Sequence, residues 1–425
     1  MRVLIVGGGA REDALSWRLA RSPSCQAVFA APGNAGTATR GENWAIAPTD
    51  GKTLADVATS EGIDLVVLGP EGAIAAGVGD RLREAGLAVF GPNRSGGRLE
   101  SSKVYAKRFM ERHGVPTARA VVAHSLESAE KALEDWPGEG VVVKADGLAA
   151  GKGVVVTSDA AAARAVVRDW YGSGKIPGGG SDVLLEERLE GREVSVFALA
   201  DGRAMVPMSA ACDYKRAGDG DTGPNTGGMG AYSPPSGFPE DLYDRVRERI
   251  LAPVLRGLLA EGEEYVGVLY CGLMWTNDGP YAIEFNARFG DPETQVLMPR
   301  VGGDFAALLE SAARGALDVS QVTYSAQSCV GVVLATDDYP RSSTPLQGLN
   351  ADVSLPEGTQ AFWGSSRLVD GTVETPGGRV LTVTGLGDDL ESARHCAYDG
   401  VRALAGRLGT RALGYRTDIG ALPQR

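Results

Sequence analysis

The chain has 425 residues, of which 43% are hydrophobic and 23% are charged, and its formal net charge at pH 7 is −12. This length exceeds one ordinary hydrophobic core, so two to four packed units are expected. The negative charge argues against nucleic acid or an anionic membrane surface as a partner. No stretch approaches the roughly 20 apolar residues of a membrane span. An anionic substrate must therefore be bound by local donors.

The positions of the cysteines and histidines limit which classes of catalytic site the chain can form. The five cysteines lie far apart with no C-x-x-C pair, which predicts reduced thiols in a cytoplasmic protein. The amino terminus leads straight into an apolar strand rather than a signal peptide. The three histidines are scattered, so a histidine-based triad is not expected. The oligomeric state stays open, and a monomer is compatible with the sequence.

Residues 1 to about 100 alternate short apolar runs with amphipathic segments, the pattern of a parallel βαβ unit. We expect strands at 2–6, 27–31, 63–68 and 87–90, and helices at 12–20, 53–59 and 74–85. Each strand is followed by a turn of small residues, at 7–9, 32–36, 69–71 and 91–93. These turns share the carboxyl edge of the sheet, where ligands bind. That edge is expected to hold an anionic small molecule through backbone N–H groups.

A nicotinamide site in this unit is an alternative, because Gly7-x-Gly9 can begin a dinucleotide fingerprint. Glu12 stands where the third glycine of that fingerprint belongs, and Pro32-Gly33-Asn34 supplies no acid for a ribose hydroxyl. An oxidoreductase is therefore the weaker hypothesis.

A helix is predicted at 99–118, with Lys103 and Lys107 among its cations. A strand, a glycine-rich loop and a second strand follow. The loop is no Walker A motif, because Asp146 replaces its first glycine and Gly153 replaces Ser/Thr.

Such a loop can cover a nucleotide, with Lys144 beneath it as a fixed charge. The alternative is a glycine hairpin that carries a surface lysine. Three valines precede Lys144, and a solvated side chain fits that setting poorly.

Two further strands are predicted between 183 and 197, joined by a short polar link in a common hairpin pattern. The segment from Glu186 to Leu189 can offer main-chain groups to an adenine edge, and Glu193 can bind ribose hydroxyls.

Residues 209–232 show neither helical nor strand periodicity. Long irregular segments inside compact domains are usually functional. With Asp213, Lys215 and many glycines, this segment fits a cradle for a polar substrate; a disordered surface loop is the alternative.

An amphipathic helix is expected at 241–260. The turn 277–279 reads Asn-Asp-Gly, which predicts a hairpin between strands at 267–275 and 281–288. A small α+β unit is predicted from 327 onward, with strands at 328–334 and 378–384 and a helix at 390–408. Arg379, at the start of a strand, can reach the substrate cleft; a simple turn at 376–379 is the alternative.

The strand from 281 to 288 is the centre of the prediction. Alternation places Glu284, Asn286 and Arg288 on one face of the strand, while Ile283, Phe285 and Ala287 pack on the other. A carboxylate and an amide oxygen two residues apart suit Mg²⁺, and a guanidinium beside them can meet an oxyanion. Glu-x-Asn alone also fits an edge strand with a solvated face.

Together these segments resemble the ATP-grasp superfamily and, within it, the phosphoribosylamine–glycine ligase family. The most specific matches are residues 145–154, 221–234 and 284–295, and residues 32–37 and 69–71 agree. The resemblance covers nearly the whole chain. It implies an α/β and α+β multidomain fold with an N-terminal parallel βαβ domain (1–100), a central ATP-grasp domain (101–326) with a mobile lid (about 118–190), and a small C-terminal α+β domain (327–425).

The resemblance also implies a reaction in which ATP phosphorylates glycine and the amine of 5-phosphoribosylamine attacks the acyl phosphate. The implied catalytic residues are Arg288, Lys144 and Asp213, and the implied metal ligands for Mg²⁺ or Mn²⁺ are Glu284 and Asn286. The implied ATP contacts are Lys103, Lys144, Gly151, Lys152, Gly153, Glu186, Leu189 and Glu193. The implied substrate contacts are Gly9, Asn34, Gly36, Glu71, Asp213, Lys215, Asp221, Asn225, Arg288, Asp291 and Glu293.

The chain departs from the family pattern at several positions. Asp13 stands where many members have histidine in the first turn, and Tyr214 replaces the usual histidine between Asp213 and Lys215. The strand before Glu284 contains no acid, so a metal would rest on Glu284 and Asn286 or borrow a nearby carboxylate. The alternatives are an ATP-grasp ligase with another acid or amine acceptor, and a non-catalytic nucleotide sensor.

Overall fold

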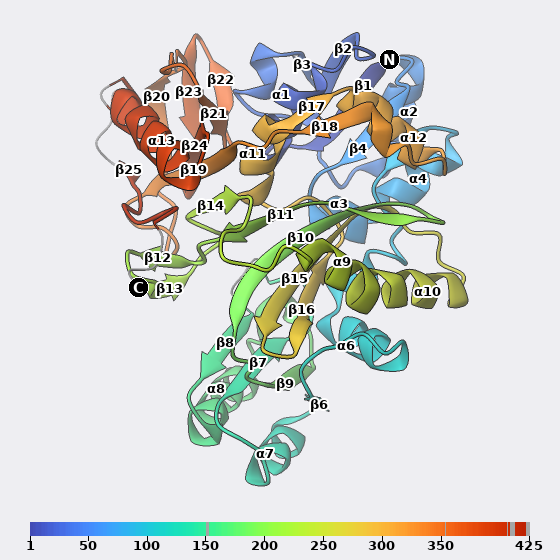
Figure 1. Cartoon of the computed structure of the whole chain (residues 1–425), viewed down its shortest axis with the longest axis vertical. Coiled ribbons are helices and arrows are strands. Elements are labelled where there is room, and N and C mark those ends of the chain that lie inside the picture. Colours follow the sequence, from blue (N-terminus) through green and yellow to red (C-terminus); the bar gives the residue numbers. More distant parts are fainter. Residues whose placement is uncertain (150–152, 353, 406, 409–412, 422–425) are drawn as a thin grey trace.

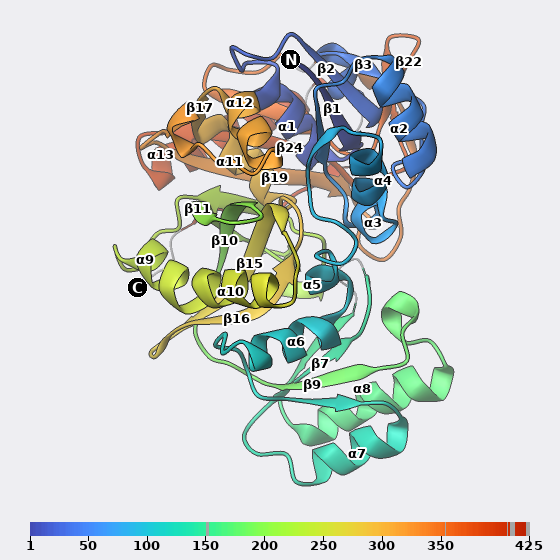
Figure 2. The same cartoon turned by 90° about the vertical axis from the view of Figure 1, so that its right-hand side faces the viewer.

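Figure 1 shows the protein as a computed structural model, in which residues 1–149, 153–352, 354–405, 407–408 and 413–421 are described. The N-terminal unit, in blue, lies beside the C-terminal unit, in red. The lid, in teal, lies at the opposite end of the long axis (Figures 1 and 2). None of the helices in these residue ranges is both long and apolar enough to cross a membrane.

The first unit is a parallel sheet, as predicted. Its elements are β1 (Arg2–Gly7), α1 (Ala10–Leu19), β2 (Ala27–Pro32), η1 (Thr37–Thr39), β3 (Glu42–Asn43), α2 (Gly51–Ser60), β4 (Leu65–Leu68), α3 (Glu71–Ala75), α4 (Val78–Glu84) and β5 (Ala88–Phe90). The strand order is β3-β2-β1-β4-β5. β1 and β4 are apolar and almost wholly buried, which is typical of strands covered on both faces. The helix predicted at 74–85 is divided, because Gly77 adopts a φ of +75° between α3 and α4.

The lid is a separate four-stranded layer with its own core. Helices α5 (Arg98–Ser101) and α6 (Lys103–Arg112) lead into β6 (Ala120–Ala123), α7 (Leu126–Glu134), β7 (Val141–Ala145), β8 (Val154–Thr157), α8 (Ala160–Ser173), η2 (Pro177–Gly179) and β9 (Val183–Glu187). The sheet order is β6-β9-β7-β8. β7 and β8 pair antiparallel around the glycine-rich loop, as expected. The hydrophobic core beneath them contains residues of this layer alone.

One long sheet forms the centre of the molecule. Its first strands are β10 (Arg192–Asp201), β11 (Met205–Asp213), β14 (Gly230–Ser233), β15 (Val266–Thr276) and β16 (Gly279–Asn286), and a small hairpin of β12 (Arg216–Gly218) and β13 (Thr222–Asn225) projects from it. The segment 209–232 was expected to be irregular, and that expectation was wrong. The expected hairpin at 183–197 was also wrong, because β9 belongs to the lid sheet and β10 pairs with β11 and β15.

Helices and a short ribbon cover this sheet. They are α9 (Leu242–Val246), a π-helical turn η3 (Arg247–Leu251), α10 (Ala252–Ala260), α11 (Glu293–Leu297), η4 (Met298–Arg300), β17 (Val301–Gly303), α12 (Phe305–Ala313), η5 (Val319–Gln321) and β18 (Val322–Tyr324). The stretch α9–η3–α10 is the amphipathic helix predicted at 241–260. β15 and β16 form the predicted antiparallel hairpin.

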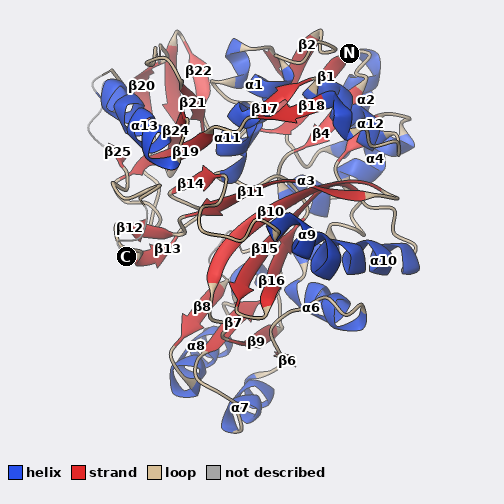
Figure 3. Ribbon diagram, viewed as in Figure 1, coloured by secondary structure: helices blue, strands red, loops and turns tan. Residues whose placement is uncertain are grey.

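The C-terminal unit continues the central sheet. Its elements are β19 (Ser328–Thr336), β20 (Leu346–Asn350), β21 (Thr359–Trp363), β22 (Arg367–Val369), β23 (Thr372–Thr375), β24 (Arg379–Gly387), α13 (Leu390–Ala405) and β25 (Leu413–Gly414). The full order is β16-β15-β10-β11-β14-β19-β24-β21, and the strands run together across the molecule in Figure 3. Because β14 pairs with β19, backbone hydrogen bonds cross the predicted boundary at 326. The placement of that boundary stays a prediction.

Candidate active site

The candidate site lies where the end of β16, the lid strand β7 and the carboxyl edge of the N-terminal sheet meet. A bulge in β16 shapes its floor: Glu284 pairs with Gly272 and Ala282 with Leu273, which leaves Ile283 without a cross-strand partner. The carbonyl oxygen of Ile283 instead accepts a hydrogen bond of 2.7 Å from Lys144 Nζ. The bulge thus links the floor of the site to the lid.

The two faces of β16 differ as the alternation predicted, with one exception. Phe285 and Ala287 are buried, whereas Glu284 and Asn286 are partly exposed. Ile283 was expected to pack with the buried set, but it is partly exposed because it is the bulged residue. Glu284 and Asn286 therefore lie on the accessible side of the strand.

The positive charges of three lysines and of Arg288 act on the Glu284 carboxylate. Burial raises the pKa of its carboxyl group, but Lys215, Lys144 and Lys103 lower it more, so the pKa lies below its usual range. Glu284 is ionised at neutral pH as a result. A site with this charge pattern can hold an anion and a cation close together.

A buried cluster of Lys107, Glu186 and Lys144 connects α6 to the lid. Lys144 Nζ lies 2.6 Å and Lys107 Nζ 2.9 Å from the Glu186 carboxylate. Burial raises the pKa of Glu186, but Lys144 and then Lys107 lower it further, so the group stays ionised. The sequence identified Lys107 only as a helix cation; the apolar spacing of α6, which buries this lysine, was the available signal.

The beginning of the glycine-rich loop is fixed to the start of α6. Ser102 Oγ donates to Asp146 at 3.0 Å, and Lys103 Nζ donates to the carbonyl oxygen of Gly147 at 2.8 Å. On the far side of the loop, the Gly153 carbonyl accepts from the Ala145 N–H at 2.8 Å. The predicted ATP contacts Gly151 and Lys152 lie outside the described residues.

Arg288 lies between two acids at the N-terminal sheet edge. Its guanidinium contacts Glu100 at 2.8 Å and Glu71 at 3.4 Å. Burial lowers the pKa of Arg288, but the negative charges of Glu100 and Glu71 raise it by more than burial lowers it. Arg288 is therefore a permanent cation. Its buried Nε, which lies 3.4 Å from Glu71 Oε2, makes no hydrogen bond of good geometry within the described residues. Glu100 was not predicted, because nothing in the sequence relates it to a residue 188 positions later.

Asp213 and Lys215 lie together at the end of β11. Lys215 Nζ is 2.5 Å from Glu193 Oε2. Burial raises the pKa of Asp213 to about 7; Lys215 opposes this shift, and Glu293 and Glu193 add to it. Burial lowers the pKa of Lys215, but the charges of Asp213 and Glu193 outweigh burial and raise this pKa well above the usual value. The pair therefore offers one permanent cation and one acid that titrates near neutrality.

A cavity of about 200 Å³ lies beside this site, between the N-terminal and C-terminal units. Gly9 and Ala10 line it from the start of α1, and Asp291 and Arg379 line it from the opposite side. Arg379 Nη1 lies 3.2 Å from Asp291 Oδ1. Arg379, which was expected to reach the substrate cleft, thus lines this cavity.

Asn34, a predicted substrate contact, and Asp13, a departure from the family pattern, both take part in the packing of the units. The Asn34 side chain donates to the carbonyls of Gly9 at 3.0 Å and Trp363 at 2.7 Å, and it accepts from the Gly36 N–H at 2.9 Å. Asp13 is fully buried against Arg40, and it accepts from the Trp363 N–H at 2.7 Å. Asp13 therefore holds the C-terminal unit, which explains how an acid is accommodated beside a predicted phosphate site.

The remaining predicted residues make other contacts. Asp221 forms an ion pair of 2.8 Å with Arg416, and Asn225 pairs with Arg216 across the β12–β13 hairpin. Leu189 is half-buried in the link between β9 and β10. Glu293 is buried at the start of α11 and accepts from the Tyr270 hydroxyl at 2.6 Å.

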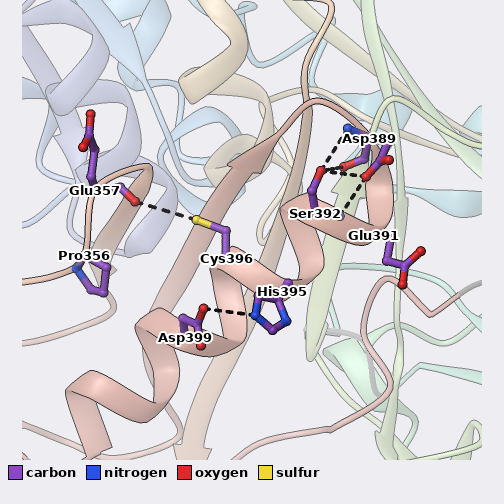
Figure 4. A pocket seen from close by; sticks show the side chains of 8 residues that line it. All are labelled: Pro356, Glu357, Asp389, Glu391, Ser392, His395, Cys396 and Asp399. Carbon is purple, nitrogen blue, oxygen red and sulfur yellow. Dashed lines mark hydrogen bonds and ion pairs between the residues drawn. The ribbon is translucent and has the colours of Figure 1, made fainter.

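A second, larger hollow of about 470 Å³ lies on the C-terminal unit along α13 (Figure 4). Its polar side chains bond mainly with one another: Asp389 accepts from the Ser392 N–H in a helix cap, and His395 lies 3.4 Å from Asp399. Cys396 faces the carbonyl oxygen of Glu357. None of the predicted site residues lines this hollow.

Glu284 and Asn286, on the accessible side of β16, carry oxygen atoms of the kind that bind a hard metal ion. The described ranges contain no group of three or more His, Cys, Asp or Glu side chains placed to hold an ion. Mg²⁺ commonly uses one or two protein oxygens and completes its shell with water and phosphate oxygens. The ionised Glu284 and the amide oxygen of Asn286 fit that requirement. The described residues do not offer enough ligands for a metal site built from protein side chains alone.

Comparison with protein families accounts for nearly the whole chain. The N domain of phosphoribosylglycinamide synthetase matches residues 1–100, its ATP-grasp (A) domain matches 101–294, and its C domain matches 329–422. A phosphoribosylamine–glycine ligase of Leifsonia xyli subsp. xyli is 45% identical over 430 residues, which cover 99% of this chain and 100% of that protein. A ligase of the same name from Allochromatium vinosum is 44% identical over 407 residues, 94% of each chain.

A longer protein and a solved structure point to the same family. The trifunctional purine biosynthetic protein adenosine-3 of Gallus gallus is 43% identical over 98% of this chain, which spans 42% of that protein. The crystal structure of phosphoribosylamine–glycine ligase from Thermotoga maritima superposes with a TM-score of 0.84 at 35% identity, covering 98% of this chain and 100% of that one. A biotin carboxylase domain from Hydrogenobacter thermophilus has a TM-score of 0.73 at 16% identity, which shows a shared fold alone.

Proposed function

Because the chain belongs to the phosphoribosylglycinamide synthetase family, we propose that it ligates glycine to 5-phosphoribosylamine in purine biosynthesis, converting ATP to ADP and phosphate. Full-length identity of 42 to 45% with ligases of this name supports the activity. The observation that carries the assignment of the site is the gathering of Lys144, Lys215 and Arg288 around Glu284. Carboxylate and triphosphate repel each other, and these cations oppose that repulsion.

In the first step, a carboxylate oxygen of glycine attacks the γ-phosphorus of ATP, and ADP leaves. Lys215 binds the glycine carboxylate and Asp213 its ammonium group. Lys144 and Lys103 hold the phosphates in line for attack. Arg288, which lies between Glu100 and Glu71, donates to the acyl phosphate.

In the second step, the amine nitrogen of phosphoribosylamine attacks the acyl carbon. The C–O bond to phosphate breaks, the nitrogen loses a proton, and the amide forms. The ribosyl phosphate occupies the cavity between Gly9 and Arg379, where a guanidinium and the N-terminus of the ten-residue helix α1 face each other. Glu71 lies beside Arg288 at the mouth of the same edge.

The nucleotide and metal contacts form the rest of the proposal. Adenosine lies against the lid at Glu186, Leu189 and Glu193, and its phosphates lie under the glycine-rich loop. Mg²⁺, or Mn²⁺ in its place, is held by Glu284 and Asn286, and when bound it neutralises charge on the phosphates. The protein acts in the cytoplasm, and a monomer contains every residue that this proposal uses.

Purified protein tests the proposal directly. With ATP, Mg²⁺, glycine and freshly generated phosphoribosylamine, we expect phosphate release that requires both substrates, and glycinamide ribonucleotide as the product. Glu284→Gln should lower kcat at least about 100-fold, because the charged ligand that would hold Mg²⁺ beside the phosphates is lost. Glu84→Gln, at an exposed position of α4, is the matched control and should retain activity.

Another carboxylate or amine acceptor is the alternative within the same fold. Phosphate release that persists when formate or bicarbonate replaces glycine would favour it. No release with any acid would contradict both ligase assignments, and ATP binding without turnover would indicate a nucleotide sensor.

A further inference from the structure

The described tail of the chain, residues 413–421, packs on the hairpin that follows Lys215. Thr417 donates to Asp219 through its N–H at 2.8 Å and its hydroxyl at 2.5 Å. The Gly220 N–H donates to Asp418 at 2.9 Å. Hydrogen bonds in both directions therefore join two segments about 200 residues apart in the sequence.

Arg416 is the centre of this contact. Its side chain is only 1% exposed, although a charged group is costly to bury without partners. Nε and Nη2 bind both oxygens of Asp418 at 2.8 and 2.7 Å. Nη1 donates to Asp221 at 2.8 Å and to the carbonyl oxygen of Arg216 at 3.0 Å. The guanidinium thus holds the tip and the base of the hairpin at once.

The same guanidinium lies over Tyr214. Its central carbon is 4.9 Å from the centre of that ring, within range of a cation–π contact. The Tyr214 hydroxyl accepts a hydrogen bond of 3.1 Å from the Gly420 N–H. Tyr214 is therefore held by the tail at its ring face and at its hydroxyl.

These contacts flank Lys215 on both sides. Tyr214 precedes it and Arg216 follows it, and Arg416 touches both neighbours. The Lys215 carbonyl is fixed in turn by the Thr226 N–H and hydroxyl, at 2.8 and 2.9 Å. The tail therefore holds the residues on either side of Lys215, whereas the Lys215 ammonium group faces Glu193 in the site.

We propose that Arg416 is a positioning residue, which fixes Lys215 and Asp213 in the orientation that binds the carboxylate substrate. This inference rests on the proposed function, because it takes those two residues as the glycine site. The tail touches neither the lid nor β16 in the hydrogen bonds described above, so its effect should fall on glycine rather than on ATP. Displacement of a binding group by about 1 Å can cost up to 100-fold in rate.

Steady-state kinetics of Arg416→Ala and Arg416→Lys test this role. We expect the KM for glycine to rise at least about tenfold in Arg416→Ala while the KM for ATP changes less than about twofold. Lysine keeps the charge but loses the fork of donors, so it should recover only part of the effect. Arg402→Ala, at an exposed position of α13, is the control and should leave both constants unchanged.

Asp221→Ala and Tyr214→Phe provide a test that does not depend on removing a buried charge. Asp221 has an exposed side chain bound to Arg416, and Tyr214→Phe removes only the hydroxyl that accepts from Gly420. Each should raise the KM for glycine selectively, and hydrogen exchange of residues 214–228 should become faster. Equal changes in the KM for glycine and ATP, or no change in either, would overturn the role of Arg416. If the unmodified protein shows no glycine-dependent turnover, the proposed function fails instead.

Discussion

At the scale of single residues, the pair of Asp213 and Lys215 determines how the site can recognise an amino acid. Lys215 stays charged because Asp213 and Glu193 outweigh its burial. Asp213 is different: burial raises its pKa to about 7, so its charge depends on pH within the physiological range. A zwitterionic amino acid needs a cation for its carboxylate and an anion for its ammonium group. Lys215 is a permanent cation, whereas Asp213 is an anion only when it is ionised.

This difference predicts how glycine binding depends on pH. In the proposed site the glycine ammonium group binds the ionised form of Asp213, so protonation of Asp213 would compete with binding. As the pH falls below about 7, the KM for glycine should rise, approaching a tenfold increase per pH unit. Initial rates at varied glycine concentration between pH 5.5 and 8.5 measure this change.

Asp213→Asn is the matched variant, because the amide keeps the size and cannot ionise. It should bind glycine weakly at every pH and lose the dependence. A wild-type KM that is constant over this range, or a dependence that survives in Asp213→Asn, would show that Asp213 does not bind the ammonium group.

At the scale of elements, Glu186 couples helix α6 to the lid strands β7 and β9. Both of its partners, Lys107 and Lys144, are buried. Removal of the acid from such a cluster leaves two ammonium groups without a counter-charge in a poorly solvated space. The cluster therefore stabilises the junction between α6 and the lid strands, and it positions Lys144.

We expect Glu186→Leu to lower the free energy of unfolding by about 3 to 5 kcal/mol and to weaken ATP binding, because the Lys144 ammonium group loses the carboxylate that helps to position it. Urea denaturation and ATP titration measure the two effects. The neighbouring Glu187 forms an exposed pair with Arg119, so Glu187→Leu should cost less than about 1 kcal/mol. Equal losses in the two variants would contradict the role given to the buried cluster.

How far the sequence predicted these elements depends on where their partners lie. The apolar runs of β1 and β4, and the Asn-Asp-Gly turn before β16, are local signals, and the parallel sheet and the hairpin were found from them. The strands between 209 and 232 were missed because glycine and proline conceal their periodicity. The pairing of Arg288 with Glu100, and of Arg416 with Asp221, depends on tertiary contacts that no local pattern records. The individual roles of the site residues stay predictions.

At the scale of the whole molecule, the lid has a hydrophobic core separate from the cores of the other units. Its core contains residues 123 to 185 alone, whereas the other clusters draw on all three units. A layer with a small core of its own can open without disrupting its neighbours. Lid motion over a bound nucleotide therefore needs no change in the long central sheet.

Native-state hydrogen exchange tests this separation. In low denaturant, amides of β7 and β9 should exchange through a local opening with a smaller free energy than amides of β10 and β19. ATP should raise the protection of the lid amides and leave the central sheet unchanged. A common opening energy for both layers would show that the molecule unfolds as one unit.

The position of β14 in the long sheet has a consequence for synthesis of the protein. This strand lies between β11, which precedes it closely, and β19, which begins about 95 residues later. While the nascent chain emerges from the ribosome, β14 presents an open edge until β19 arrives, and open edges attract foreign strands. A fragment that stops near residue 326 would keep that edge permanently and should form aggregates, however complete its nucleotide site.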